Sequence, residues 1–300
     1  MNRPTPTDAI ATFVRVVELG SFAAAAAERG LTASGVSRTV SRLEDRLGVR
    51  LLQRTTRRLA LTPEGETMLA RGREILAAVE AAEAEVMAAR GHPRGLVRVN
   101  TGTAFARHRL APILPAFHER YPDVSIELSV ADRRVDIIGE QIDVAIRTGP
   151  LDDSTLVARR LGSATRVITA SPAYLARHGV PRTPADLARH TCLRLTGYSR
   201  LAEWPLRVGG TVVPVKVSGA VTSDSADAIL DMTLAGLGIS RLAGFILEDA
   251  IAAGRLVPLL VDHHVSEEVP ITALMPPGRQ ALPRVRALVD FLVETAGRAP

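Results

Sequence analysis

Serine and arginine side chains share one side of the segment from residue 32 to residue 47. An arginine can donate two parallel hydrogen bonds to a phosphate or to a guanine edge, and a serine hydroxyl can bond to either. An ordinary solvated helix face mixes Glu and Lys, whereas this face has no acid before Glu44. Its composition therefore favours contact with a nucleic acid over simple solvation. The polar residues of the face are Ser34, Ser37, Arg38, Ser41 and Arg42.

No other group of reactive side chains has the spacing that catalysis or metal binding requires. Four of the seven histidines lack a second ligand three or four residues away, and the adjacent pair His263 and His264 would point apart. The stretch "GLGIS" begins like a dinucleotide-binding fingerprint, but Arg241 stands where its third glycine would be. Neither a nucleophile elbow nor a Walker loop is present. We therefore expect no enzyme activity, no cofactor and no metal.

Positive charge is concentrated near the N-terminus. Residues 1 to 62 hold ten arginines against five acids, and their net charge of +5 equals that of the whole chain. A basic segment of this kind indicates an anionic partner. We expect no signal peptide, and no apolar run approaches the ~18 residues of a membrane span. Cys192 is the single cysteine, so no internal disulfide can form, which is typical of a cytoplasmic protein. We expect it to be a small buried hydrophobe, with a redox sensor as the alternative.

Three short helices are expected to position the serine and arginine face. Apolar residues between positions 8 and 18 recur at i, i+3, i+4 and i+7, the spacing of one helical face. Gly20 ends that helix, and Ser21 can cap an alanine-rich second helix that closes at Gly30. Thr32 can cap the third helix. This order is the helix-turn-helix pattern, in which the second helix of the pair enters the major groove of DNA by its N-terminal residues.

A basic hairpin follows the third helix. Leucines flank the stretch from Arg54 to Arg58, so two short strands with a basic tip are expected. Such a wing would place Arg54, Arg57 and Arg58 against the phosphate backbone or the minor groove. Thr62 then caps a fourth helix that has Pro63 at its first position. We assign residues 1 to 62 to a winged helix-turn-helix.

The fourth helix, residues 63 to 90, carries apolar and small residues in steps of four and three. This spacing is typical of the seam of a two-stranded coiled coil, although burial against the chain's own domains remains the alternative. A dimer would pair two reading heads with the two halves of a palindromic site. The seam residues are Met68, Gly72, Ile75, Val79, Ala82 and Val86. Two glycines and Pro93 predict a hinge at residues 91 to 95.

Strand-like and helix-like segments alternate from residue 96 to residue 300. "LVRVN" is typical of a strand, "RLAPILPAFHERYP" of a helix and "VSIELSV" of an alternating strand. A further helix is expected around residues 135 to 140. This alternation predicts an α/β domain with mostly parallel sheets.

The stretch "FVRVVELGSFAAAAAERGLTASGVSRTVSRLEDRLGVRLLQRTTRRLALTPEGE" resembles the LysR-type transcriptional regulator family, and "DVAIRTGPLDDSTLVARRL", "ASPAYLARHG" and "AGLGISRL" resemble its effector-binding domain. The resemblance implies a sequence-specific DNA-binding regulator modulated by a small metabolite. The implied fold is an α/β effector domain of two solute-binding-protein-like subdomains, preceded by an all-α winged helix-turn-helix and a long linker helix. Subdomain one would comprise residues 95 to 166 and 266 to 300, and subdomain two residues 167 to 265.

Carried over by position, the family's groove contacts fall on Ala33, Ser34, Ser37 and Arg38, and its wing contact falls on Arg54. Many members have Gln or Pro where this chain has Ala33, whose methyl group can touch thymine but cannot form a hydrogen bond. Specificity should therefore depend more on Ser34, Ser37 and Arg38. The expected DNA-binding set is completed by Thr32, Arg42, Arg57 and Arg58.

The resemblance also implies a ligand site between the subdomains. The ligand-facing positions are Thr101, Gly102, Thr103, Arg147 and Ser223. Free backbone N–H groups where a helix begins can bind an anion, and Arg147 could add a charge-assisted pair. The alternatives are that Arg147 holds a structural salt bridge and that Thr101 and Thr103 only cap a helix.

The expected partners are double-stranded DNA with an inverted-repeat site, a small and often anionic effector, RNA polymerase, and further copies of the chain in a homotetramer or homodimer. No membrane contact is expected. A ligand-insensitive architectural DNA-binding protein and a small-molecule-binding receptor are the rival interpretations. The basic N-terminal segment and the expected lack of a signal peptide count against the receptor.

Overall fold

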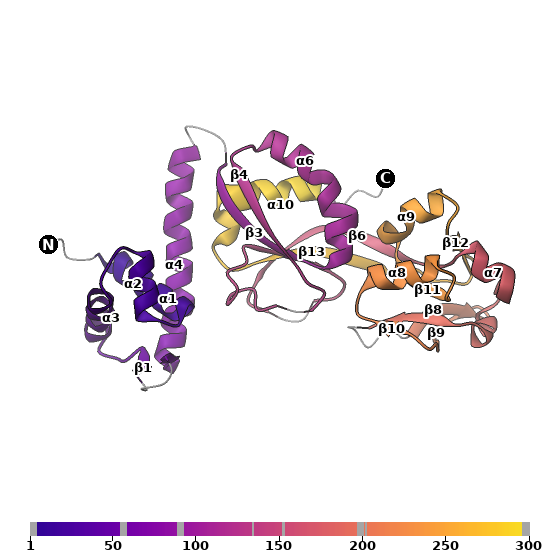
Figure 1. Cartoon of the computed structure of the whole chain (residues 1–300), viewed down its shortest axis with the longest axis horizontal. Helices are drawn as coiled ribbons and strands as arrows, with labels where there is room; N and C mark the ends of the chain where they lie inside the picture. The colour runs from indigo at the N-terminus through magenta and orange to yellow at the C-terminus, as the bar shows by residue number, and fades with distance from the viewer. Residues whose placement is uncertain are drawn as a thin grey trace. The chain divides into compact units, whose positions relative to one another are not determined.

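The computed structural model describes residues 5–54, 59–88, 93–133, 135–151, 154–196, 201 and 203–295. The chain forms two compact units, one made of residues 1–93 with 277–286 and the other of residues 94–276 with 287–300. Helices dominate the first unit, whereas the second is built on a large mixed sheet (Figure 1).

The first unit has three short helices, a hairpin and a long helix. Its elements are α1 (Pro6–Leu19), α2 (Phe22–Glu28), α3 (Ala33–Leu47), β1 (Leu52–Arg54), β2 (Leu59–Leu61) and α4 (Pro63–Ala88). The predicted caps Ser21, Thr32 and Thr62 are confirmed, because each hydroxyl accepts the backbone N–H three residues further on. The strands β1 and β2 pair antiparallel, as the expected wing requires. The unit is therefore mainly helical, and the expectation of an all-α unit holds except for this hairpin.

One apolar core holds the first unit together. Phe13 and Val16 of α1 are fully buried in a cluster that includes Val36 of α3. Burying a side chain of this size contributes roughly 1.5–3 kcal/mol. The first half of α4 closes the core, since a Cβ atom on Gly72 would lie 2.9 Å from Ile10 Cγ2 of α1. Gly72 therefore belongs to the packing within the unit, not to a seam between chains.

A helix that crosses a membrane must be both long and apolar. No single helix in the described part of the chain meets both requirements. The pair α1 and α2 does so only when the two are joined across a bend of 120°. Most of the apolar side chains of α1 are buried in the core of the first unit.

Strands and helices alternate along the second unit. Its elements up to the long strand are β3 (Gly95–Thr101), α5 (Thr103–Phe105), η1 (Ala106–Leu110), α6 (Ala111–Arg120), β4 (Val124–Val130), β5 (Val144–Thr148) and β6 (Val157–Ala170). The next group is α7 (Pro172–His178), η2 (Pro184–Arg189), β7 (Cys192–Leu195), β8 (Glu203–Val208), β9 (Thr211–Lys216), β10 (Thr222–Ser223) and α8 (Ala226–Leu234). The last are β11 (Ile239–Ala243), α9 (Gly244–Ala252), β12 (Val257–Pro258), β13 (Glu268–Met275) and most of α10 (Pro283–Thr295). The short η4 (Arg279–Ala281) and the first residues of α10 belong to the first unit.

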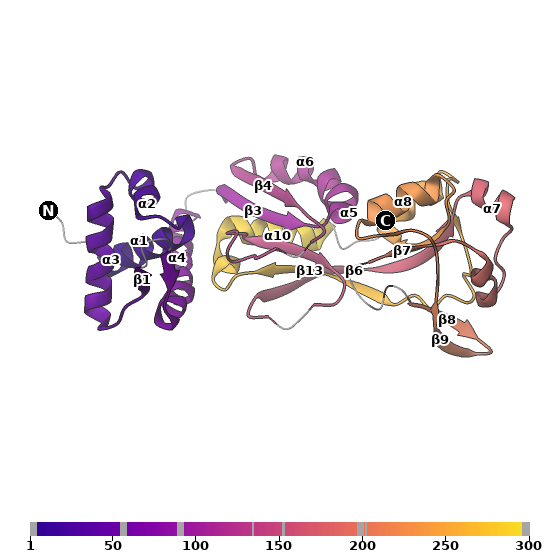
Figure 2. The same cartoon turned by 60° about the horizontal axis from the view of Figure 1, so that its bottom comes forward.

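Two antiparallel strands join the two halves of the sheet. The strand order is β10-β7-β11-β6-β13-β5-β3-β4, and β12 pairs with β6. The strand β3 runs parallel to β4 and β5, and β7 runs parallel to β10 and β11. Figure 2 shows β6 and β13 side by side between these halves, paired antiparallel. We call the half with β3, β4 and β5 subdomain one, and the half with β7, β10 and β11 subdomain two. The prediction of mostly parallel sheets is right within each half and wrong for the strands that join them.

The prediction of a helix around residues 135 to 140 is wrong. Residues 137–141 form a turn instead. The side chain of Asp136 accepts the backbone N–H groups of Ile138 and Gly139 at 3.2 and 2.9 Å, which favours a turn over a helix. Gln141 then takes φ of 56°, a left-handed conformation that prevents continuation.

Candidate nucleic-acid interface and ligand-binding region

The helix α3 presents its predicted polar face to solvent and its apolar face to the core. Val36, Val40 and Leu43 are fully buried, whereas Ala33, Ser34, Arg38 and Arg42 are exposed and Ser37 is half-buried. At the start of the helix, Thr32 Oγ1 and Ser34 Oγ lie 3.2 Å apart, and Arg38 Nε donates to the carbonyl oxygen of Ser34 at 3.3 Å. The side chain of Arg38 is therefore folded back along the N-terminal turn that the helix-turn-helix pattern directs toward the groove.

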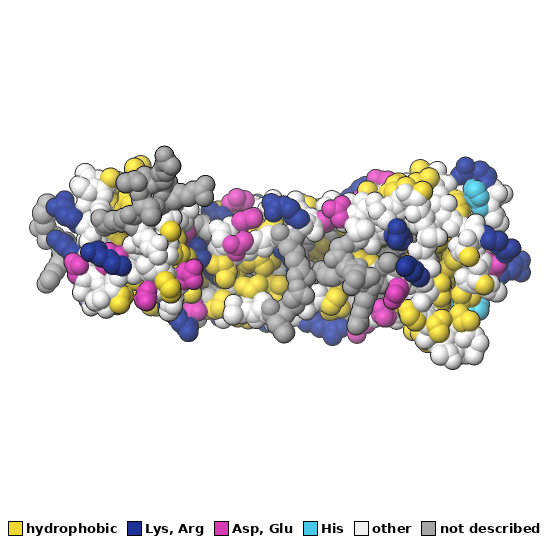
Figure 3. Space-filling view, turned by 90° about the horizontal axis from the view of Figure 1, so that it is seen from below, with side chains coloured by type: hydrophobic (Ala, Val, Ile, Leu, Met, Phe, Trp, Pro, Cys, Tyr) yellow, Lys and Arg dark blue, Asp and Glu magenta, His cyan; other side chains and the backbone are white. Residues whose placement is uncertain are grey.

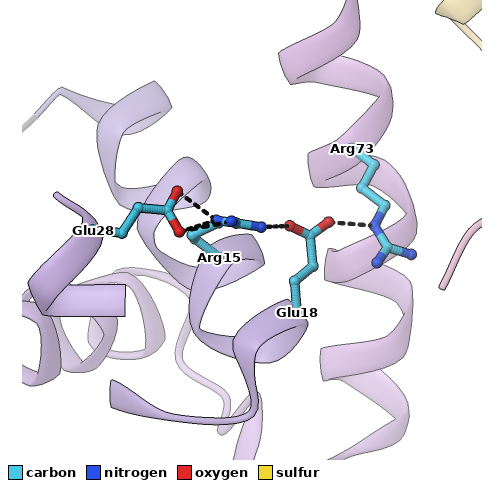
Figure 4. A network of polar contacts seen from close by, with 4 residues as sticks. All are labelled: Arg15, Glu18, Glu28 and Arg73. Atoms are coloured by element: carbon cyan, nitrogen blue, oxygen red, sulfur yellow. Dashed lines mark hydrogen bonds and ion pairs between the residues drawn. The ribbon is translucent and has the colours of Figure 1, made fainter. Parts of the chain in front are cut away.

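Arginines of α1 and α4 are committed to ion pairs inside the first unit. Arg15 donates to the carboxylate of Glu28 at 2.6–2.9 Å and to Glu18 at 3.1 Å. Glu18 also accepts from Arg73 Nε at 3.2 Å, so one chain of charges links α2, α1 and α4 (Figure 4). These pairs lie at the surface of the unit and are partly buried, and they occupy the guanidinium groups.

The arginines of the α3 face are not committed in this way. Within the described residues, Arg38 and Arg42 take part in no salt bridge, and no carboxylate of α3 precedes Glu44. On the face shown in Figure 3, Lys and Arg side chains and Asp and Glu side chains both occur on each of the two units. Two exposed arginines without a salt bridge on one helix face are the arrangement that phosphate and base-edge contacts need.

Glu44 ties the start of the wing to α3. Its carboxylate is almost fully buried and accepts the backbone N–H groups of Leu51 and Leu52 at 2.9 and 3.1 Å. Arg50 Nη1 donates to the same group at 2.8 Å. Burial alone would raise the pKa of Glu44, but these three donors lower it below its usual value. Glu44 thus fixes the strand that carries the wing relative to the recognition helix.

The predicted wing contacts lie at the edge of the described residues. The backbone of Arg54 pairs with Leu59 between β1 and β2, so the strand that precedes the tip is present. Arg57 and Arg58 lie outside the described residues. The basic tip therefore stays a prediction.

The seam residues of α4 divide into two groups. Met68 is half-buried and packs against the core of the first unit, as Gly72 does. Ile75, Val79, Ala82 and Val86 are exposed and recur at i, i+4, i+7 and i+11, so they lie on one side of the helix. The first turns of α4 therefore pack within the first unit. The later turns carry an exposed apolar stripe, which is the part of the helix that the coiled-coil interpretation assigns to a seam.

We expect the exchange V79E to weaken self-association. A carboxylate on each chain at the centre of a coiled-coil seam would face apolar side chains and a like charge, so the dimer dissociation constant should rise at least about tenfold. Sedimentation equilibrium of the full chain measures this constant. The matched control is A78E, at an exposed position one residue away from the stripe. Equal dissociation constants for the two variants would mean that the stripe is not the seam.

The predicted anion cradle at residues 101 to 103 already holds an internal carboxylate. Thr103 donates to Asp132 from its backbone N–H at 2.9 Å and from its hydroxyl at 2.7 Å. A Cβ atom on Gly102 would lie 2.9 Å from Asp132 Oδ1, so glycine permits this approach. The hydroxyl of Thr101 is fully buried and has no hydrogen-bond partner. The donors of Thr103 are therefore occupied, and an external anion would have to displace Asp132.

Arg147 and Ser223 also have partners inside the protein. Arg147 Nη2 donates to Asn100 Oδ1 at 2.6 Å, and its Nη1 donates to the carbonyl oxygen of Ile146 at 3.0 Å. Ser223 Oγ accepts the backbone N–H of Ser225, the residue that caps α8, at 3.1 Å. Among the contacts of Arg147 are thus a neutral side-chain amide and a backbone carbonyl, and its contact with a ligand stays a prediction.

Side chains from α5 and η1 bridge the two subdomains. Arg109 Nη2 donates to the carboxylate of Glu248 on α9 at 2.9 and 3.1 Å. His108 Nε2 lies 2.9 Å from Asp227 Oδ1 on α8, and the other oxygen of that buried carboxylate has no hydrogen-bond partner. Phe105 packs edge-on against Phe245 at 6.3 Å between ring centroids. Any change in the angle between the subdomains must break or rearrange these contacts.

Several residues that shape these sites had no signal in the sequence. Asp132, Asp227 and Glu44 are acids whose partners lie far along the chain or in the next element, so their roles follow only from the fold. Cys192 is fully buried, and burial raises the pKa of its thiol to about 12. Since the thiolate is the reactive form, the buried-hydrophobe interpretation is favoured over a redox sensor. No cluster of three or more His, Cys, Asp or Glu that could hold a metal occurs within the described ranges.

Comparison with known protein families assigns both units. Residues 7–66 match the model for bacterial regulatory helix-turn-helix proteins of the lysR family, and residues 90–297 match the LysR substrate binding domain. The chain belongs to the LysR family of transcriptional regulators. It is accordingly a DNA-binding regulator whose second unit is a domain for binding small molecules.

Individual family members match almost the whole chain. The HTH-type transcriptional regulator CrgA of Neisseria meningitidis serogroup C is 39% identical over 98% of this chain and 98% of its own. A structure of CrgA has a TM-score of 0.66 at 38% identity, covering 98% of this chain and 100% of that one. The structure of AphB, a virulence activator of Vibrio cholerae, has a TM-score of 0.59 at 28% identity, covering 97% and 100%.

Proposed function

We propose that this protein recognises an inverted-repeat DNA site through the start of α3 and the wing, as a homodimer or as a tetramer of two dimers. Ser34, Ser37, Arg38 and Arg42 would meet base edges and phosphates in the major groove. The observation that carries the proposal is that Arg38 and Arg42 are exposed without a salt bridge in the described structure, while Arg15 and Arg73 are paired. The arginines of the wing would add phosphate or minor-groove contacts.

The effector would bind between the two subdomains and change their relative angle. The polar groups proposed to meet it are those of Thr101 and Thr103 in subdomain one, Ser223 in subdomain two and Arg147 on β5. Except for Thr101, these groups would have to exchange their internal partners for the ligand. The bridges from Arg109 and His108 would differ between the liganded and unliganded arrangements. A ligand acts only through such differential contacts, because equal affinity for both arrangements shifts neither. The changed angle would alter DNA bending and access of RNA polymerase, without enzyme activity and within the cytoplasm.

Fluorescence anisotropy with two DNA duplexes tests this function. One duplex carries the protein's own upstream region and the other a shuffled sequence of the same composition. We expect tighter binding to the first, with affinity that falls steeply as salt rises because phosphate contacts release counterions. Equal affinity for the two duplexes across the salt series would contradict sequence-specific recognition. A metabolite screen in the same assay that changes neither affinity nor DNA bending would favour the ligand-insensitive architectural protein.

A further inference from the structure

A chain of directed hydrogen bonds joins the long helix α4 to residues 5–54, which we call the reading head. Arg15 of α1 donates from Nε and Nη2 to the Glu28 carboxylate of α2 at 2.6–2.9 Å, and from Nη1 to Glu18 Oε2 at 3.1 Å. The other carboxylate oxygen of Glu18 accepts from Arg73 Nε of α4 at 3.2 Å (Figure 4). Glu18 therefore connects the pair α1 and α2 to α4.

The charged groups of this network lie partly out of solvent. The side chain of Glu18 is 12% exposed, and those of Arg73 and Arg15 are 24% and 28% exposed. Salt screens partly buried pairs less than exposed ones, and the two-pronged contact of Arg15 with Glu28 holds the guanidinium in one orientation. Glu28 is the last residue of α2, four residues before the Thr32 cap of α3. The network thus extends from the turn before the recognition helix to α4.

The start of α4 is fixed to the reading head at one point. The backbone N–H of Thr62, the cap of α4, donates to the carbonyl oxygen of Leu51 at 3.0 Å. Further along α4, Gly72 allows close apolar contact with α1. Apolar contact is non-directional, whereas a hydrogen bond weakens as its angle bends. The bond from Arg73 to Glu18 is therefore a directional contact that restrains the sideways swing of α4 about its start.

A small change in the angle between the head and α4 has a large effect along the exposed stripe. The stripe begins at Ile75, two residues after Arg73, and extends to Val86, which is about 16 Å of helix. A tilt of about 10° at its start displaces its far end by about 3 Å, close to the length of one base pair. In a dimer joined through the stripe, this angle determines where the second head meets the DNA.

We propose that the network of Glu28, Arg15, Glu18 and Arg73 determines which spacing between two DNA half-sites this protein accepts. The inference rests on the proposed function, in which the two heads of a dimer read one inverted-repeat site. While the network is intact, each head is held at one angle, so a site with another spacing strains the protein or the DNA. When it is broken, the head turns on α4 and accepts neighbouring spacings. Glu18 and Arg73 act as positioning residues, because their role does not require contact with DNA.

Fluorescence anisotropy of the full chain with a set of duplexes tests the network. The first duplex carries the inverted repeat of the protein's own upstream region, located by footprinting, and the others have one base pair added to or removed from its spacer. One base pair changes the separation of the half-sites by about 3.4 Å and their relative rotation by about 35°. We expect the wild type to bind the altered duplexes at least about tenfold more weakly, and we call this ratio the spacing penalty.

Two variants remove the bond between α1 and α4 while keeping unbranched side chains. In R73M and in E18M the spacing penalty should fall below about threefold, because a head that can turn on α4 follows the displaced half-site. R73K, whose ammonium group can still donate to Glu18, should keep most of the penalty.

The matched control is R71M. Arg71 Nη1 pairs with Glu74 Oε2 at 2.8 Å within α4, so this exchange removes an arginine and an ion pair of the same helix without loosening it from α1. We expect R71M to have the spacing penalty of the wild type.

A spacing penalty that is unchanged in R73M and E18M would overturn the proposal, and R73M decides alone if E18M does not fold. Specific binding by the wild type without any penalty would do the same, as would an equal drop in R71M, which would show an effect of net charge. A lower unfolding temperature of R73M with an unchanged penalty would assign the network a purely structural role. Failure of the proposed function is a different result, in which the wild type binds its own region no more tightly than the shuffled duplex.

Discussion

Replacing Arg38 by alanine is expected to weaken binding to the protein's own DNA site by about 1–3 kcal/mol, or roughly 5- to 150-fold. The guanidinium lies back along the N-terminal turn of α3, is exposed and, among the residues that the structure describes, bonds only to the carbonyl oxygen of Ser34. If it reads a guanine edge, R38A loses affinity for the specific duplex and little for the shuffled one. If it contacts only phosphate, both affinities fall together and the salt slope decreases by about one.

The matched control for this measurement is R46A. Arg46 is an exposed arginine in the last turn of the same helix, so the exchange removes the same charge far from the groove-facing end. We expect R46A to retain specific binding to within about threefold, since surface substitutions away from an interface usually change free energies by less than ~0.5 kcal/mol. Equal losses in R38A and R46A would show that the effect is one of net charge, and the start of α3 would lose its assigned role.

The parts of the structure that sequence could predict are those decided by local chemistry. Ser21, Thr32 and Thr62 cap helices because a hydroxyl reaches an N–H three residues away, and that signal lies within one turn of chain. The exposed face of α3 could be predicted for the same reason, because its apolar residues recur with the period of a helix and leave the polar residues on the other side. The turn at residues 137–141 was missed because Asp136 offers its own backbone an alternative to helix, which apolar periodicity does not reveal.

The ligand region could not be predicted because its decisive contacts join distant residues. Thr103 was expected to present free donors, yet Asp132, 29 positions further on, binds both of them. The pair of His108 with Asp227 spans 119 positions and exists only because α8 packs near η1. A single sequence shows which groups are charged but not which of them the fold leaves without a partner.

Replacing Glu44 by alanine is expected to destabilise the first unit by about 3 kcal/mol. The change leaves the buried N–H groups of Leu51 and Leu52 without an acceptor, and each orphaned donor costs about 1–3 kcal/mol. Hydrogen exchange of the full chain measures the loss, as reduced protection of amides in residues 5–54. The fluorescence of Trp204, the single tryptophan, reports on the second unit and should be unchanged.

The pH dependence of stability gives a second, independent measure of the Glu44 clamp. Because the folded pKa lies below the usual 4.5, the folded state binds fewer protons than the unfolded state as pH falls. The stabilisation is thus fully present above pH 4.5 and is lost as pH falls through the folded pKa. The wild-type first unit should lose protection in this window more steeply than E44Q, whereas D45N, at the exposed neighbouring acid, should follow the wild type. Parallel curves for wild type and E44Q would mean that the charge of Glu44 does not hold the wing.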